Sequence, residues 1–189
     1  MKNLKTIAIA FLIAFGTATA SAQTKKVDVN KSTITWEGKK VTGKHDGTVK
    51  LQDGVLTFKS KKLTGGSFTI DMNSIAVTDL KAGQGKEKLE GHLKADDFFG
   101  TDKFATSRLV FTKVTPKTAN VYTVTGDLTI KGITKPVTFD MTVNKNTATA
   151  DVTIDRTKYD IRYGSKSFFE SIGDKAIYDD FEIKVTLVF

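Results

Sequence analysis

An apolar–polar alternation with a period of two residues recurs along almost the whole chain and constrains the fold more than any other feature. In one run, Phe68, Ile70 and Met72 alternate with Thr69 and Asp71. Comparable runs occupy residues 33–37, 56–59, 109–113, 122–130, 137–143, 148–154 and 181–189. Such alternation predicts strands with one buried and one solvated face, as in antiparallel sheets. About eight strands of this kind predict an all-β fold that closes as a barrel or stacks as a sandwich.

Short polar and glycine-rich clusters separate these runs. They predict turns at residues 52–54, 64–66, 131–132 and 144–146. Two segments lack the alternation. Leu89 and Leu93, four apart between Lys86 and Leu93, predict a short amphipathic helix, and residues 165–173 predict one helical turn or a packed loop. The absence of repeats and linkers predicts a single domain over residues 23–189.

The first 22 residues have the composition of a secretory signal peptide. Lys2 and Lys5 precede an apolar run at residues 7–15, and small residues follow up to the Ala20-Ser21-Ala22 pattern. This order predicts removal of residues 1–22, with cleavage before Gln23. We therefore expect a periplasmic protein, with secretion into the medium as the second choice. The chain has no cysteine, so disulfides are excluded.

The net charge of +8 raises the question of anionic partners. Arginine occurs only at Arg108, Arg156 and Arg162, and the lysines are scattered along the chain. Nucleic-acid recognition usually relies on clustered guanidinium groups, so we expect no nucleic-acid partner. Transient contact with an acidic membrane surface is compatible with this charge. The sequence leaves a monomer and a homodimer equally open.

Residues suited to catalysis are few. The only histidines are His45 and His92, and the adjacent carboxylates at residues 96–97 and 179–180 point apart in an extended chain. The sequence has no zinc-protease, nucleophile-elbow, phosphate-loop or dinucleotide motif. We expect no enzymatic activity and no cofactor. The alternative is a metal-assisted enzyme built around His45 and His92.

The aromatic content allows two interpretations. The chain has 13 Phe, 4 Tyr and 1 Trp, many of them on the buried face of predicted strands. Such residues ordinarily form a packed core. In an eight-stranded barrel, however, they also form the wall of a cavity for one slender ligand. The Phe pairs at residues 98–99 and 168–169 lie outside the strands, where they are suited to cover a barrel mouth.

Five sequence blocks stand out along the chain: Thr-Gly-Lys-His-Asp-Gly at 42–47, Ile-Asp-Met-Asn-Ser-Ile at 70–75, the His-Leu…Asp-Phe-Phe segment at 92–99, the Gly-Asp-Leu-Thr…Pro-Val-Thr-Phe segment at 126–139, and Asp-Arg-Thr at 155–157 followed by Asp-Asp-Phe at 179–181. Together these blocks resemble the YceI-like family of lipocalin-like, polyisoprenoid-binding exported proteins. Their order along the chain follows that of the family.

This resemblance implies an eight-stranded antiparallel lipocalin-like barrel with one or two short helices near its mouth. It further implies non-catalytic binding or transport of a long isoprenoid-type lipid, either a polyisoprenoid or a quinone, in the barrel cavity. Each buried methylene contributes about 0.8 kcal/mol to such binding. The alternative is an exported stress-related or protein-interaction module with a packed core and no ligand.

Three groups of residues follow as predicted ligand contacts. The predicted cavity lining is Trp36, Phe58, Phe68, Ile70, Leu109, Phe111, Tyr122, Phe139, Met141 and Phe181. The predicted lid residues are Leu93, Phe98, Phe99 and Phe168. The predicted polar groups at the mouth are His45, His92 and Arg156.

Overall fold

A computed structural model describes residues 21–169 and 173–189, so nearly all of the predicted signal peptide lies outside the described residues. The described chain contains β1 (Ala22–Lys26), β2 (Thr33–Lys40), β3 (Gly43–Lys59), β4 (Lys62–Val77), α1 (Lys86–Lys94), β5 (Thr106–Pro116), β6 (Val121–Ile130), β7 (Ile133–Asn144), β8 (Thr147–Asp155) and β9 (Ile177–Val188). Two short 3-10 helices, η1 (Arg156–Tyr159) and η2 (Gly173–Lys175), lie between β8 and β9. No described helix is both long and apolar enough to cross a membrane.

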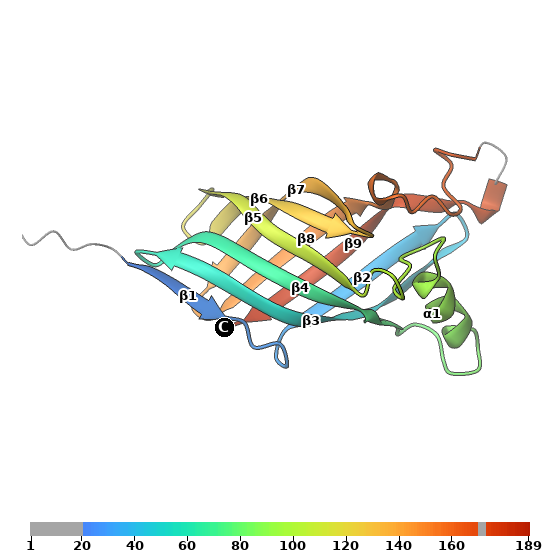
Figure 1. Cartoon of the computed structure of the whole chain (residues 1–189), viewed down its shortest axis with the longest axis horizontal. Coiled ribbons are helices and arrows are strands. Elements are labelled where there is room, and N and C mark those ends of the chain that lie inside the picture. The colour runs from blue at the N-terminus through green and yellow to red at the C-terminus, as the bar shows by residue number, and fades with distance from the viewer. Residues whose placement is uncertain (1–20, 170–172) are drawn as a thin grey trace, which may run out of the picture.

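Eight of these strands form a closed antiparallel barrel. The sheet order runs β3-β2-β9-β8-β7-β6-β5-β4, and pairing of β3 with β4 closes the ring (Figure 1). Along one edge of the long strand β3 the first half pairs with β2 and the second half with β1, while the other edge pairs with β4. The predicted all-β barrel is therefore confirmed.

Two of the predicted turns are wrong, because residues 52–54 and 64–66 lie within strands. In β3 the inward face moves from odd to even positions after Leu51, where a register shift against β4 leaves Gln52 exposed. This irregularity is a β-bulge, which bends a strand without ending it. Gly54 and Gly66 lie beneath aromatic rings: an added Cβ would approach Phe68 to 2.7 Å and Phe111 to 2.9 Å. These two glycines therefore allow an aromatic ring to pack closely on the strand and do not form a turn.

The actual β3–β4 turn consists of Ser60 and Lys61, both with positive φ. The predicted turns at 131–132 and 144–146 are confirmed as the β6–β7 and β7–β8 hairpins. Lys131, Gly132 and Lys145 have positive φ there, as tight hairpins require.

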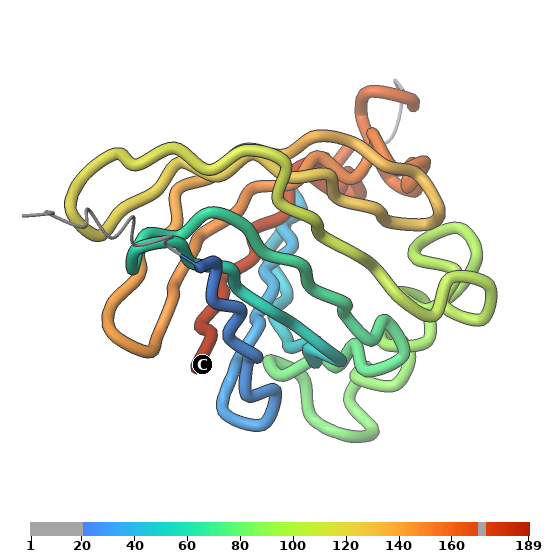
Figure 2. The backbone as a smooth tube through the Cα atoms, turned by 60° about the vertical axis from the view of Figure 1, so that its left-hand side comes forward, coloured from blue at the N-terminus to red at the C-terminus, as the bar shows by residue number. Residues whose placement is uncertain are grey.

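One end of the barrel is filled by side chains. Leu56 and Val124 are fully buried, and Phe58 and Tyr122 are 7% and 6% exposed. The chain following β1 reaches this end, where the Asp28 amide donates to the Val188 carbonyl at 2.7 Å. Figure 2 shows β1 and the C-terminus near each other beside the β3–β4 hairpin.

The opposite end carries the helices. The predicted helix between Lys86 and Leu93 is confirmed as α1, which stands with the β8–β9 connection at the right-hand end of Figure 1. Two contacts fix α1 to the end of β4: the Val77 amide donates to the Glu90 carboxylate at 2.9 Å, and Lys86 Nζ donates to the Val77 carbonyl at 2.8 Å.

Candidate functional site

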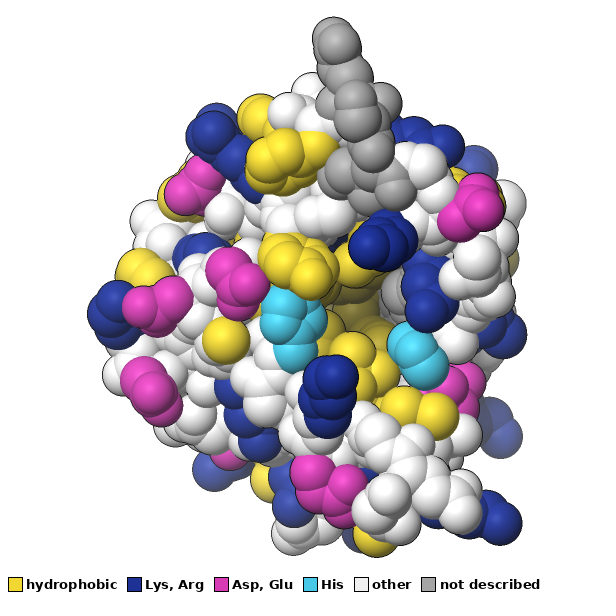
Figure 3. Space-filling model, turned by 90° about the vertical axis from the view of Figure 1, so that its right-hand side faces the viewer, with side chains coloured by type: hydrophobic (Ala, Val, Ile, Leu, Met, Phe, Trp, Pro, Cys, Tyr) yellow, Lys and Arg dark blue, Asp and Glu magenta, His cyan; other side chains and the backbone are white. Residues whose placement is uncertain are grey.

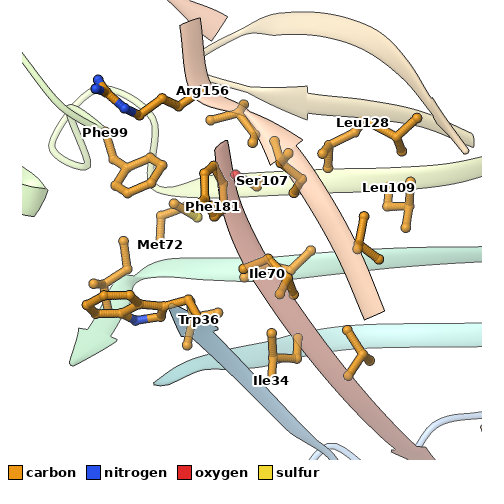
Figure 4. Close-up of a pocket in the computed structure, with 18 of the residues that line it drawn as sticks. Ile34, Trp36, Ile70, Met72, Phe99, Ser107, Leu109, Leu128, Arg156 and Phe181 are labelled. Atoms are coloured by element: carbon orange, nitrogen blue, oxygen red, sulfur yellow. The ribbon is translucent and has the colours of Figure 1, made fainter. Parts of the chain in front are cut away.

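The barrel contains a cavity of about 200 Å³ that opens at the end carrying α1. All eight barrel strands contribute to its wall, together with Leu93 of α1 and the Phe98–Phe99 pair that follows it. Figure 3 shows the opening as a hollow lined by yellow side chains, and Figure 4 shows the aliphatic and aromatic side chains that converge inside. A single buried water needs only about 10–15 Å³, so the cavity has room for a much larger occupant.

The cavity is long relative to its volume. On β9 its wall runs from Ile177 to Leu187, ten residues apart. At about 3.3 Å per residue and a strand tilt of about 40°, this corresponds to about 25 Å along the barrel axis. The shape therefore fits a slender, extended molecule.

Polar side chains are almost absent from the wall. Ser107, Arg156, Tyr178 and Asp180 are the exceptions, and Tyr178 and Asp180 are exposed at the mouth. Trp36 also lies in the wall, where its indole N–H donates to the Thr48 carbonyl at 3.3 Å. Apart from the buried Ser107 hydroxyl, the interior therefore provides no polar side chain that would recognise a polar ligand along its length.

The end of α1 and the segment after it place three apolar side chains at the mouth. Gly100, with a φ of 57°, donates its amide to the Ala95 carbonyl at 2.8 Å, and the Phe99 amide donates to the Leu93 carbonyl at 3.1 Å. This compact turn directs Phe98 and Phe99 toward the cavity beside Leu93. The Phe99 ring approaches Phe181 of β9 at a centroid distance of 6.4 Å.

Arg156 lies at the mouth, but its guanidinium is occupied by the protein itself. It donates to four backbone carbonyls: Ile161 and Tyr163 at 2.8 Å, and Ile177 and Tyr178 at 3.1 Å. Burial lowers the pKa of Arg156. The negative charges of Asp179, whose carboxylate lies 3.7 Å from the guanidinium, and of Asp155 raise it and offset part of this effect. Arginine stays protonated under these conditions. The guanidinium therefore has a structural role in the β8–β9 connection, and its contact with a ligand stays a prediction.

The two histidines flank the opening but do not belong to its wall. Figure 3 shows both, in cyan, at the rim of the hollow. His45 Nδ1 lies 2.8 Å from the Asp79 carboxylate. His92 packs edge-on against Tyr163 at 4.4 Å and Phe98 at 5.5 Å. Within residues 21–169 and 173–189, no three His, Asp or Glu side chains are grouped as a metal site would require.

Most of the predicted lining and lid residues lie in the cavity wall. They are Trp36, Phe68, Ile70, Leu93, Phe98, Phe99, Leu109, Phe139, Met141 and Phe181. Their contact with a ligand remains a prediction.

Four of the predicted lining and lid residues do not belong to the wall. Phe58 and Tyr122 are packed into the filled end, where Phe58 lies 5.5 Å from Phe189. Phe111 packs against Phe68 and Phe139 at 5.5 and 6.1 Å. Phe168, predicted as a lid residue, is 46% exposed on the outer surface. Alternation predicts which face is inward, but it does not predict how far along the axis the interior is filled.

The residues predicted from the sequence do not include the aliphatic half of the wall. These residues include Ile34, Val49, Leu51, Met72, Leu128, Ile130, Val137, Ala150, Val152, Ile154, Ile183, Val185 and Leu187. Many of them have the same parity on the same strands as the aromatic residues that were selected. Extending the alternation rule to every apolar residue of each run would have found all of them except Val49 and Leu51, which lie outside those runs.

Three solved structures resemble the fold. Burkholderia cenocepacia BcnA is 25% identical with a TM-score of 0.69, over 86% of this chain and 99% of that chain. A polyisoprenoid binding domain from Saccharophagus degradans is 12% identical with a TM-score of 0.57, over 86% of this chain and 95% of that domain. The Campylobacter jejuni YCEI protein is 14% identical with a TM-score of 0.52, over 98% and 96%.

Curated relatives match part of the sequence. A UPF0312 protein of Shewanella denitrificans is 36% identical over 86 residues, and protein YceI of Escherichia coli O157:H7 is 34% identical over 94 residues. These matches cover 46% and 50% of this chain but only 42% and 46% of the relatives. The chain thus spans somewhat less than half the length of these two relatives. The family model of the YceI-like domain, in contrast, matches residues 26–189, and the protein therefore belongs to the YceI-like family.

Proposed function

We propose that this protein binds or transports a long isoprenoid-type lipid, either a polyisoprenoid or a quinone with an isoprenoid tail. One observation carries the proposal: a narrow apolar cavity of about 200 Å³ extends through much of the barrel and opens at one end. The tail occupies this cavity and the polar head remains at the mouth, where Tyr178 and Asp180 are exposed.

The energetics of burial support this assignment. Each methylene that leaves water contributes about 0.8 kcal/mol, and association costs roughly 4–15 kcal/mol. About five to twenty buried carbons therefore compensate for the cost without a single hydrogen bond. A cavity about 25 Å long accommodates a chain of this size.

Similar proteins also support a lipid ligand, since the domain from Saccharophagus degradans that shares this fold is described as polyisoprenoid-binding. The alternative, an exported interaction module without a ligand, requires a packed interior, and the observed cavity does not meet that requirement. The predicted signal peptide supports a periplasmic location, which fractionation of the native cell would test.

The ligand is tested by extraction. Protein purified from its native host without detergent is treated with organic solvent, and the extract is analysed by mass spectrometry. We expect an isoprenoid lipid in stoichiometric amounts, and delipidated protein should bind an added quinone or prenyl alcohol. An empty extract together with no binding of either probe would refute the proposal.

A matched pair of variants locates the binding within the cavity. Ala150 on β8 is 7% exposed and lies in the wall, whereas its neighbour Thr149 faces solvent. Ala150→Phe places a ring inside the cavity, so we expect prenyl-lipid affinity to fall at least about tenfold. Thr149→Phe adds the same ring on the outer face and should leave affinity unchanged. Equal affinities in the two variants would exclude the cavity as the binding site.

A further inference from the structure

Large apolar side chains gather around the mouth of the barrel. In the part of the chain that the structure describes, the exposed large hydrophobic residues have exposures between 42% and 50%: Val41, Tyr163, Phe168, Phe169 and Tyr178. Val41 belongs to the β2–β3 turn, and the others belong to the β8–β9 connection or the start of β9. All of them lie at the open end, and we call this set the rim.

Backbone hydrogen bonds join these segments into one surface. The Val41 amide donates to the Ala176 carbonyl at 3.1 Å, and the Ile177 amide donates to the Gly164 carbonyl at 2.8 Å. Tyr163 and Tyr178 are thereby held beside each other and beside the β2–β3 turn. Figure 3 shows yellow side chains bordering the hollow at this end.

The apolar surface continues from the rim into the cavity. Tyr178 is half exposed and at the same time lies in the cavity wall. A ligand leaving the cavity therefore reaches the rim without crossing a polar barrier at this residue. This continuity distinguishes the rim from scattered apolar residues on an ordinary surface, which need no functional explanation.

Cationic groups accompany the rim. The Arg162 guanidinium lies 4.7 Å above the Phe168 ring, while Asp160 pairs with it at 2.8 Å. Three lysines near the rim are exposed and form no ion pair with another described residue: Lys40, Lys166 and Lys175. Asp174 and Asp180 are also exposed there, so the positive charge is modest and supplements the apolar contact.

We propose that the rim docks on the surface of a lipid bilayer that contains anionic lipids, with the mouth of the barrel facing the bilayer. This inference rests on the proposed lipid-binding function. Tyrosine and phenylalanine are suited to the interface between headgroups and acyl chains, and exposed lysine attracts anionic headgroups. Docking in this orientation lets an isoprenoid chain pass between bilayer and cavity without entering water. Exchange at the membrane is required because such a chain has little free concentration in water.

The filled end of the barrel provides an internal control. Lysines are exposed there on the β3–β4 hairpin: Lys59, Lys61 and Lys62. The described residues at that end include no large apolar side chain that is comparably exposed. If charge alone directed the protein to a membrane, the two ends would bind equally well.

The first test measures the aromatic contribution. The mature chain is floated with vesicles of phosphatidylcholine, with or without phosphatidylglycerol, for the wild type and the Phe168→Ser/Phe169→Ser variant. We expect the wild type to bind the anionic vesicles, and we expect the variant to partition at least about tenfold less. Both residues are exposed, so the variant should keep the wild-type melting temperature, which circular dichroism checks.

The second test measures the charge contribution with two matched triple variants. The rim variant carries Lys40→Gln, Lys166→Gln and Lys175→Gln. The control variant carries Lys59→Gln, Lys61→Gln and Lys62→Gln. We expect the rim variant to bind anionic vesicles severalfold more weakly and with less dependence on salt, and the control to bind within about twofold of the wild type.

Three outcomes would overturn the proposal: no binding of the wild type to anionic vesicles, wild-type binding by the Phe168→Ser/Phe169→Ser variant, or an equal loss in both triple variants. Self-association that disappears in the aromatic variant, without vesicle binding, would assign the rim to a second copy of the chain. Organic extraction of the same preparations separates the two proposals. Protein that carries lipid but does not float refutes docking alone, whereas protein that floats without binding any prenyl lipid refutes the carrier function alone.

Discussion

Removal of the Arg156 guanidinium should destabilise the protein, because this group organises the connection at the mouth. It donates to the carbonyls of Ile161, Tyr163, Ile177 and Tyr178, which belong to both ends of the connection. A hydrogen bond from a charged donor contributes about 1.5–3 kcal/mol. Of these four hydrogen bonds, only the one to the Ile161 carbonyl is fully buried. In Arg156→Met, water can therefore reach the other three carbonyls. After this discount, we expect a loss of about 3–5 kcal/mol, similar to that for breaking a buried ion pair.

Urea unfolding of delipidated protein measures this loss. Fluorescence of Trp36, the only tryptophan, and far-ultraviolet circular dichroism should report one coincident transition. With a slope of about 2 kcal/mol per molar urea, the midpoint should fall by about 2 M. Arg108→Met is the matched control: Arg108 is exposed on β5, so its loss should cost no more than about 0.5 kcal/mol.

The conservative variant Arg156→Lys tests the geometric part of the reasoning. Lysine keeps the charge, but its single ammonium group cannot reach four carbonyls arranged around a planar guanidinium. We therefore expect Arg156→Lys to be at least about 2 kcal/mol less stable than the wild type. Wild-type stability of Arg156→Lys, or a loss below about 1 kcal/mol in Arg156→Met, would refute the structural role.

Three further predictions concern the rest of the barrel. Leu56→Ala in the filled end, where Leu56 is fully buried, should cost about 2–5 kcal/mol in thermal or urea unfolding, and a loss below about 1 kcal/mol would mean that this end is loosely packed. Gly91→Ala should stabilise α1 by up to about 1 kcal/mol because nothing lies within 4 Å of its added Cβ. Gly126→Ala should instead destabilise the protein, since the added Cβ would lie 2.9 Å from a backbone oxygen. A change of the same sign in the free energy of unfolding for both variants would contradict this reasoning. Burial raises the pKa of Asp79, but the contacts to His45 and a backbone amide outweigh it and lower the pKa below 3.8. Asp79 therefore stabilises the fold above about pH 4, and its contribution disappears as the pH falls through the lowered pKa. Asp79→Asn should be less stable than the wild type near pH 7 and indistinguishable from it below that pKa, which urea unfolding across this range checks.

Local patterns predicted most of the strands and their inward faces. Phe68, Ile70 and Met72 share a parity, and all three lie in the cavity wall. The turns predicted at residues 52–54 and 64–66 are wrong. A glycine in a turn and a glycine that packs beneath an aromatic ring cannot be told apart in a sequence. The distinction depends on Phe68 and Phe111, which lie on neighbouring strands.

The candidate site shows the same division. Aromatic residues of predicted inward faces lie both in the wall, as Phe139 does, and in the filled end, as Phe58 does. Phe98–Phe99 and Phe168–Phe169 are the same dipeptide outside the strands, yet one pair lines the mouth and the other is exposed. The hydrogen bonds around Gly100 turn the first pair inward, and they involve residues before and after it.

The sequence by itself determined the all-β class and the inward face of most strands, because period-two burial is a property of neighbouring residues on one strand, and its resemblance to the YceI-like family indicated the barrel. Only the tertiary structure decided where the interior is empty, which end opens, and that the exposed aromatic residues and lysines share that end. Those features depend on the register among eight strands and on contacts between residues more than a hundred positions apart, such as Val41 and Ala176. An alternation pattern contains no information about distances of that kind.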